Sequence, residues 1–434
     1  MATKKDTTKT PKTKKKSEGS FFDDLLEKVG LEIPVAAKSD DTKNIKFLST
    51  GSLMLNALVS GSMNGGIAAN KITALAGEEA TGKTFIALQC VQNFLDNNPK
   101  GEVFIFDSED DPSKLKGTLE QRGIDPNRVR VRRVNTIQDF RHKAIQIIDK
   151  YLEYDEAKRP PMFFVLDSLG NLSTLKELHD TAKNALNKKG EDVRDMTRTS
   201  LIRGLFRVLT IKLGEAMVPL LITNHTYETM NPYGASKAMS GGGGLKYAAS
   251  TIVFLGKKKL RDEEKDVIGS ILTATLDKSR FTRYGLSAEL LLTHAAGLDR
   301  YWGLFDFGVE TGLLIKGTGI PDKADKAGKK NGIKVNDYKF PDGQTGSRKE
   351  IEANPAQFFE SPENFAAFEE QCAKSFLFGT GEAPPVLESD DDETEFDIDA
   401  LDADDDVPTE DDLVEAEADE ALAEQKEPKK KGKK

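Results

Sequence analysis

Cysteine and tryptophan are scarce in this chain of 434 residues, which contains two Cys and one Trp. Cys90 and Cys372 can form at most one bridge, which excludes a disulfide-built secreted scaffold and a Cys-rich zinc module. No apolar run approaches the roughly 18 residues that a membrane-spanning helix needs. The Lys-rich start is not followed by the apolar stretch of a secretory signal. These absences predict a cytoplasmic protein without a membrane segment.

Basic residues are outnumbered only because of the C-terminal region. The chain has 62 Lys and Arg against 72 Asp and Glu, a net charge of −10. Between Glu388 and Glu424 there are 20 acidic residues and no Lys or Arg. The rest of the chain, with 52 acids against 62 bases, is therefore slightly basic. An acidic tail on such a protein typically repels other anions, competes with polyanions for basic surfaces, or keeps the protein soluble.

Composition divides the chain into five segments, at residues 1–19, 20–44, 45–314, 315–378 and 379–434. The first, a Lys-rich tail, and the last, the acidic tail, are too poor in apolar residues for a core and are predicted to be disordered. The second contains Phe21–Val29, whose apolar residues have the spacing of a short amphipathic helix. This N-terminal helix packs on its own core or on a neighbouring subunit, and spacing alone does not separate the two.

The third segment alternates short apolar runs with longer mixed stretches, which predicts an α/β fold with a mostly parallel central sheet. The later runs lie closer together, so we expect antiparallel strands on one side. In the fourth segment, Phe340–Thr345 is typical of a turn between short strands, and Asn354–Phe376 of a small helical subdomain. The predicted strands are Ile72–Ala76, Val103–Phe106, Met162–Leu166, Val218–Thr223, Thr251–Leu255 and Ile271–Leu276.

A complete P-loop pattern, G-x-x-x-x-G-K-[ST], lies between the first predicted strand and a predicted helix, Thr84–Val91. In such a loop, backbone N–H groups and the helix N-terminus face phosphate oxygens. Lys83 is expected to reach the β- and γ-phosphates of ATP, and Thr84 to hold Mg²⁺. The predicted ATP-binding residues are Gly77, Glu78, Glu79, Ala80, Thr81, Gly82, Lys83 and Thr84.

Two carboxylates are predicted beside this loop. Asp167 closes the apolar run Met162–Leu166, the usual arrangement for a second residue at the Mg²⁺ site. Glu109 follows the strand Val103–Phe106 and is placed to orient an attacking water. Three neighbours are equally close to that position, and spacing does not choose among them: Asp107, Asp110 and Asp111.

In this order, these residues resemble the RecA-type strand-exchange recombinases, and most nearly the UvsX-type recombinases of tailed phages. The likeness covers roughly residues 45 to 315. It implies a RecA-like P-loop ATPase core, and it selects Glu109 as the catalytic carboxylate. Beyond the P-loop, it rests on residues 49–53, 56–58, 107–109, 167–172, 195–198, 205–207, 224–229 and 239–242.

The resemblance gives roles to further residues. Asn224 and His225 stand where the family senses the γ-phosphate. Lys278 and Arg280 stand where it places cations that reach ATP on the next subunit, so with Glu109 and Lys83 they complete the predicted catalytic set. Two loops are expected to bind DNA. The predicted DNA-binding residues are Lys188, Lys189, Arg194 and Arg198 in the first loop, and Met230, Tyr233, Lys237, Gly241, Gly242 and Gly243 in the second, between Tyr227 and Gly244.

The chain departs from the family pattern at one point that matters for the nucleotide. The segment Asp110–Glu120 lacks the aromatic residue that commonly stacks on adenine there, which leaves the mode of base recognition open. The P-loop is intact, although the phage branch often has an irregular one. Residues 315–380 match only weakly.

The implied function is an ATP-dependent filament on single-stranded DNA that pairs it with a homologous duplex. Its cofactors are ATP and Mg²⁺. Its partners are both DNA forms, further copies of the chain, and also a single-strand-binding protein and a loading mediator. A phage-encoded chain would act in the cytoplasm of the infected host cell. Three rivals remain: a hexameric motor of the same core fold, an ATP-binding switch and a plain structural assembly protein.

Overall fold

The computed structural model describes residues 45–109, 112–187, 197–231, 234–240, 242–317 and 336–379. The predicted N-terminal helix and the two predicted disordered tails therefore lie outside these residues, apart from Gly379.

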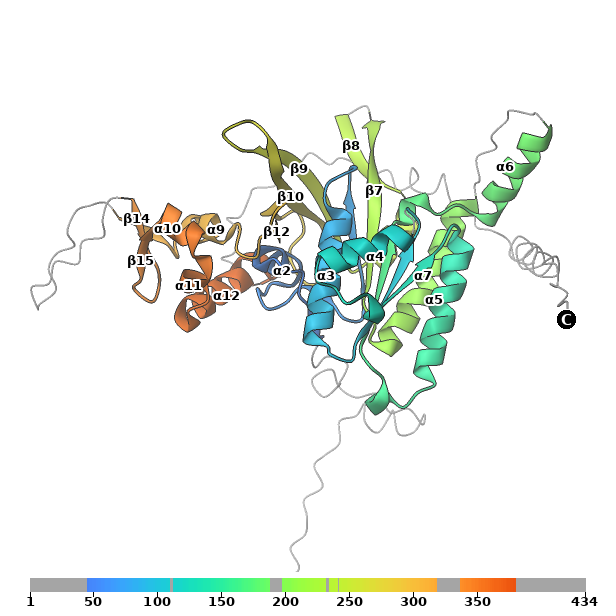
Figure 1. Ribbon diagram of the computed structural model, residues 1–434, viewed down its shortest axis with the longest axis horizontal. Coiled ribbons are helices and arrows are strands. Elements are labelled where there is room, and N and C mark those ends of the chain that lie inside the picture. The colour runs from blue at the N-terminus through green and yellow to red at the C-terminus, as the bar shows by residue number, and fades with distance from the viewer. Residues whose placement is uncertain are drawn as a thin grey trace, which may run out of the picture. The chain divides into compact units, whose positions relative to one another are not determined.

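A central sheet with a parallel core carries the fold (Figure 1). In the described part of the chain, its parallel strands lie in the order β5-β4-β6-β7-β3-β9. Both faces of this region are covered, which is why the strands are near-continuous apolar runs. The mostly parallel α/β class is confirmed. The strands are β3 Ile72–Gly77, β4 Glu102–Asp107, β5 Val129–Arg133, β6 Met162–Asp167, β7 Leu220–Asn231 and β9 Thr251–Arg261.

Antiparallel strands extend the sheet beyond β9, as the closer spacing of the later runs predicts. They are β10 Val267–Ser279, β11 Ser287–Thr293 and β12 Gly297–Leu298. On the other side of β3, the far half of β7 leaves the parallel sheet and pairs antiparallel with β8 Gly234–Met239.

Helices cover the two faces of the sheet and create two hydrophobic cores (Figure 1). On one face, α3 Lys83–Asn97 and α4 Pro112–Gln121 contribute apolar residues to the first core. On the other, α5 Ile137–Leu152 and α7 Thr197–Ala216 fill the second core. The remaining elements of this region are β1 Phe47–Leu48, α2 Leu53–Ser60, β2 Ile67–Ala68, α6 Leu175–Asn187 and α8 Gly242–Ala248.

The C-terminal elements share the first core rather than forming a separate one. The turn expected at Phe340–Thr345 joins two antiparallel strands, and the expected helices follow it. Glu369 accepts hydrogen bonds from the Ser62 hydroxyl and from the Met63 N–H, the latter at 2.7 Å. These elements are α9 Leu304–Glu310, β13 Ile315–Lys316, β14 Asp337–Lys339, β15 Thr345–Ser347, α10 Arg348–Ala353, α11 Pro355–Phe359 and α12 Pro362–Phe376.

Phenylalanine rings fill the centre of this C-terminal region. Phe340 lies 5.3 Å from Phe358 and 5.5 Å from Phe359 between ring centroids, and Phe359 lies 5.3 Å from Phe368. Such offset and edge-on pairs stabilise beyond the burial of their area. Among the described helices, none is long and apolar enough to cross a membrane.

Replacing Phe368 with Ala is expected to lower the free energy of unfolding by about 3–5 kcal/mol, because the ring is almost fully buried and its loss leaves a cavity. Phe368 is 1% exposed, whereas Phe378, on the same C-terminal segment, is 58% exposed. Phe378→Ala is therefore the matched control, with little expected change. Urea unfolding followed by circular dichroism measures both, and equal losses would contradict this packing.

Candidate active site

The P-loop curls between β3 and α3 in a conformation that its glycines make possible. Gly82 has φ +82° and caps α3, a left-handed conformation that favours glycine. A Cβ on Gly82 would lie 2.9 Å from the Leu292 side chain, so the position also needs the missing side chain for space. The Thr81 hydroxyl donates to the Glu78 carbonyl at 2.8 Å and braces the curl.

Lys83 points into this loop. Its Nζ donates to the carbonyls of Gly77 at 2.9 Å and Glu78 at 2.7 Å. Burial lowers the pKa of Lys83, while the carboxylates of Glu109 and Asp167 act in the opposite direction. The ammonium is thus partly desolvated and held by two carbonyls of the loop. A cation at this place can pair with a phosphate.

Asp167 ends β6 beside the start of α3. Its carboxylate accepts hydrogen bonds from the hydroxyls of Thr223 and Thr84. Burial raises the pKa of Asp167, these two hydrogen bonds lower it, and the negative charges of Glu109 and Asp107 raise it further. A carboxylate and a hydroxyl are oxygen ligands of the kind Mg²⁺ prefers, and a divalent cation would relieve the buried negative charge. Thr84 and Asp167 therefore fit the predicted metal site.

Glu109 faces across the sheet edge to His225. Its Oε1 lies 2.8 Å from His225 Nε2, and both side chains are about one-third exposed. Asp107, in contrast, is buried and its Oδ1 accepts the N–H of Glu109 at 2.9 Å. Asp107 therefore shapes the turn that presents Glu109. The other two competing carboxylates, Asp110 and Asp111, lie outside the described residues.

Asn224 and His225 lie inside β7, not after its end as the sequence predicts, because the strand continues into pairing with β8. They still lie at the sheet edge, since His225 is the last residue of β7 in register with β3, opposite Gly77. Asn224 is buried, and its Nδ2 donates to the Ser240 carbonyl at 2.6 Å. The two residues therefore connect the P-loop edge to the end of the β7–β8 hairpin.

The stretch expected to be an irregular second loop is a β-hairpin followed by a helix. Tyr227 to Asn231 pair with Gly234 to Ala238, and α8 begins at Gly242. Thr226, Tyr227 and Thr229 favour strand, which outweighs the glycines of this stretch. A Cβ on Gly244 would lie 3.0 Å from Ile202, so this glycine serves the packing of α8 on α7. Tyr233 and Gly241, and the side chains of Met230, Lys237 and Gly242, lie outside the described residues.

In the first expected DNA loop, the structure describes one of the four basic side chains. Lys188, Lys189 and Arg194 lie outside the described residues. Arg198, in the first turn of α7, donates to the Gly170 carbonyl at 3.0 Å and lies 3.8 Å from Glu177. It therefore ties the end of this loop to the turn that follows Asp167.

Lys278 and Arg280 lie near the amino ends of the parallel strands, whereas the P-loop lies at their carboxyl ends. Ser279 pairs with Thr251, which pairs with Thr73 at the start of β3. Gly77 is four residues further on, about 13 Å along the strand. Lys278 Nζ donates to the carbonyls of Lys246 and Tyr247 at the end of α8. Burial and the nearby cations Arg280 and Lys246 lower the pKa of Lys278, while Asp277 opposes them.

The sequence gives no indication of one further cation at the loop. Lys257 on β9 donates to the Glu79 carbonyl at 2.8 Å. It stands in a run of three lysines that looks like an exposed face. Only the pairing of β9 with β3 brings it to the P-loop.

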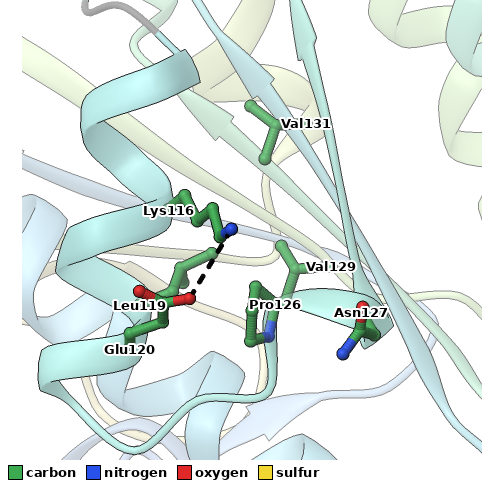
Figure 2. A pocket seen from close by; sticks show the side chains of 7 residues that line it. All are labelled: Lys116, Leu119, Glu120, Pro126, Asn127, Val129 and Val131. Carbon is green, nitrogen blue, oxygen red and sulfur yellow. Dashed lines mark ion pairs between the residues drawn. The ribbon is translucent and has the colours of Figure 1, made fainter.

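A hollow lies away from these residues, between α4 and the edge strand β5 (Figure 2). Its volume is about 430 Å³. Leu119, Val129 and Val131 give it an apolar lining, and an ion pair of 3.8 Å between Lys116 and Glu120 lies at its side. None of the predicted site residues lines it.

Comparison with known proteins supports the resemblance. No protein-family model matches the chain. The chain is 31% identical over 264 residues to the recombination and repair protein of Enterobacteria phage T4, covering 61% of this chain and 63% of that protein. It is 24% identical over 305 residues to protein RecA of Malacoplasma penetrans, covering 70% and 85%. The likeness to RecA-type recombinases and to a phage relative is confirmed, although the match spans under two thirds of the phage protein.

Asp167→Asn is expected to stabilise the nucleotide-free protein near neutral pH. Because burial raises the pKa of Asp167 in the folded state, its charged form opposes folding above the ordinary carboxyl pKa. In more acidic solution the carboxyl is protonated in both states and the penalty disappears. Melting temperatures should therefore favour the variant at about pH 7.5 and converge towards about pH 4. The variant should also lose the Mg²⁺-dependent part of stabilisation by ATP; an unchanged pH profile would contradict the assignment.

Proposed function

With the likeness to RecA-type recombinases as the premise, we propose that this chain is an ATP-dependent homologous recombination and repair protein. It forms a filament on single-stranded DNA, pairs that strand with a homologous duplex, and hydrolyses ATP when DNA is bound. The observation that carries the proposal is the 2.8 Å contact between Glu109 and His225, which joins the P-loop edge to the β7–β8 hairpin.

In this mechanism the chain's own residues bind the phosphates, orient the attacking water and hold the cation that neutralises charge. The P-loop N–H groups and Lys83 hold the phosphates of ATP. Glu109 accepts a proton from the attacking water, and its contact with His225 fixes its direction. Thr84 and Asp167 would hold Mg²⁺, which when bound neutralises charge on the β- and γ-phosphates.

The same residues offer a route from nucleotide to DNA. A γ-phosphate beside Glu109 competes with that carboxylate for the N–H of His225 and so acts on β7. Asn224 passes the change to Ser240 at the base of the hairpin, 2.6 Å away. On the other side, Arg198 links the turn after Asp167 to the first DNA loop. Both proposed DNA elements are thus one hydrogen bond from the sheet edge, and ATP favours the state that grips DNA.

The remaining partners follow from the same proposal. Lys278 and Arg280 lie at the other end of the strands from the subunit's own P-loop. They therefore contact an ATP bound by the next subunit, which requires a homo-oligomer. Residues 20–44 supply part of the subunit contact. The hollow beside β5 (Figure 2) is a suitable acceptor, since its apolar side chains can pack against the apolar face of the predicted N-terminal helix. A single-strand-binding protein and a loading mediator rest on the resemblance alone.

The first test is ATP hydrolysis with and without single-stranded DNA, for the parent and for Glu109→Gln. DNA should stimulate the parent strongly, and the variant should lose about 10²–10⁴-fold in turnover because its amide accepts no proton. Glu102→Gln is the matched control, since Glu102 lies at the other end of β4 in an exposed ion pair with Arg130. Equal turnover with and without DNA would contradict the link from His225 to the DNA elements and favour an ATP-binding switch.

A mixing experiment tests the contact between subunits. Lys83→Ala removes the phosphate lysine, and Arg280→Ala removes the cation offered to the neighbour; each alone should lose about 10³-fold or more in turnover. In an equal mixture, about a quarter of the interfaces combine an intact P-loop with an intact Arg280, so part of the activity should return. The measurement is DNA-stimulated phosphate release at a fixed total concentration. No recovery over a range of mixing ratios would contradict a shared site.

A further inference from the structure

An arginine that pairs with no acid among the described residues lies next to the P-loop helix. The guanidinium carbon of Arg122 lies 3.6 Å from the centre of the Phe85 ring, a close cation–π stack. Within the described ranges, its guanidinium has neither a hydrogen bond nor an ion pair. Burial lowers the pKa of Arg122, and no carboxylate among the described residues opposes this shift. A guanidinium has five donors, so such a position calls for a ligand.

The end of α4 holds Arg122 in place. Its N–H donates to the Leu119 carbonyl at 3.1 Å, and Gly123, with φ +71°, turns the chain out of the helix. Leu119 and Ile124 on either side are buried in the first core. Arg122 is therefore presented on a fixed backbone, with its guanidinium over the face of Phe85.

The pair lies where the base end of a nucleotide has to lie. Phe85 directly follows Thr84 in the first turn of α3, and a Cβ on Gly297 would lie 2.9 Å from the tip of its ring. The ring thus fills the space between α4 and the β11–β12 turn. A nucleotide with its phosphates on the P-loop extends away from the loop past this first turn, because the ribose and base follow the α-phosphate.

We propose that Arg122, supported by Phe85, is the platform on which the nucleobase stacks. This proposal rests on the proposed function and adds the missing base site to it. The helix that would carry a stacking aromatic ring, Pro112–Gln121, has none, whereas the residue that follows it offers a planar guanidinium. Guanidinium planes stack on π systems, and Phe85 fixes the plane from below.

A stacking platform reads the face of a base, which every base has. It therefore strengthens binding with little discrimination among purines. Contact through the edge of the guanidinium would instead favour guanine, whose O6 and N7 accept two hydrogen bonds from arginine. The proposal commits to stacking, so ATP, dATP and GTP should depend on Arg122 to similar extents.

The experiment compares Arg122→Met and Arg122→Lys with the parent and with Arg141→Met, an exposed arginine on α5. Both changes at Arg122 should raise the KM for ATP about 5- to 30-fold with little change in DNA-stimulated kcat. Inhibition by inorganic tripolyphosphate, which has no base, should be unchanged. Arg141→Met should match the parent in every measurement.

Three results would overturn the proposal. The first is an unchanged KM for ATP in both variants. The second is full recovery with Lys, which keeps the charge but not the plane. The third is a parallel loss of tripolyphosphate inhibition, which would place Arg122 on the phosphates. Melting temperatures identify a variant that fails to fold, and Arg122→Lys then carries the test. Failure of the function itself differs, since the parent would then hydrolyse no ATP and Lys83→Ala would change nothing.

Discussion

The register of the parallel strands is the constraint on which the site depends. Gly77 is opposite His225 across β3 and β7, and Asp107 is opposite Asp167 across β4 and β6. Backbone hydrogen bonds fix these pairs, and parallel strands bring all their carboxyl ends to one edge. Residues separated by up to 148 positions therefore meet without a dedicated contact. A shift of one residue in either pair would turn the side chains to the other face and remove the site.

The charged groups at this edge are held in states that oppose stability. Burial lowers the pKa of Lys83 and raises that of Asp167, so each charged form is disfavoured where it stands. Neighbouring hydroxyls, carbonyls and opposite charges offset only part of this cost of burying the two charges. A polyanionic ligand with a divalent cation relieves both at once. The charges at this edge thus favour the binding of such a ligand.

The fold class and the phosphate site could be predicted from the sequence because their signals are local. The P-loop is one contiguous pattern, and Asp167 ends a run that is unmistakably a buried strand. The hairpin at residues 227–239 could not be predicted, because glycines mask a strand tendency that only pairing reveals. Lys257 and Arg122 were missed for a related reason: each depends on a neighbour distant in sequence, Glu79 and Phe85. The roles of the basic loop residues stay predictions.

The placement of the two cations has a further consequence for a proposed filament. Lys278 is fixed to the end of α8, and α8 follows the β7–β8 hairpin directly. If Lys278 serves the neighbour's ATP, then a movement of the hairpin on DNA reaches that ATP through α8. The subunit's own ATP reaches the same hairpin through Asn224. Each hairpin is then coupled to two nucleotides, the subunit's own ATP and the neighbour's. A lone subunit has only the first of these two couplings. Hydrolysis gated by both DNA and assembly follows from this arrangement without any additional switch.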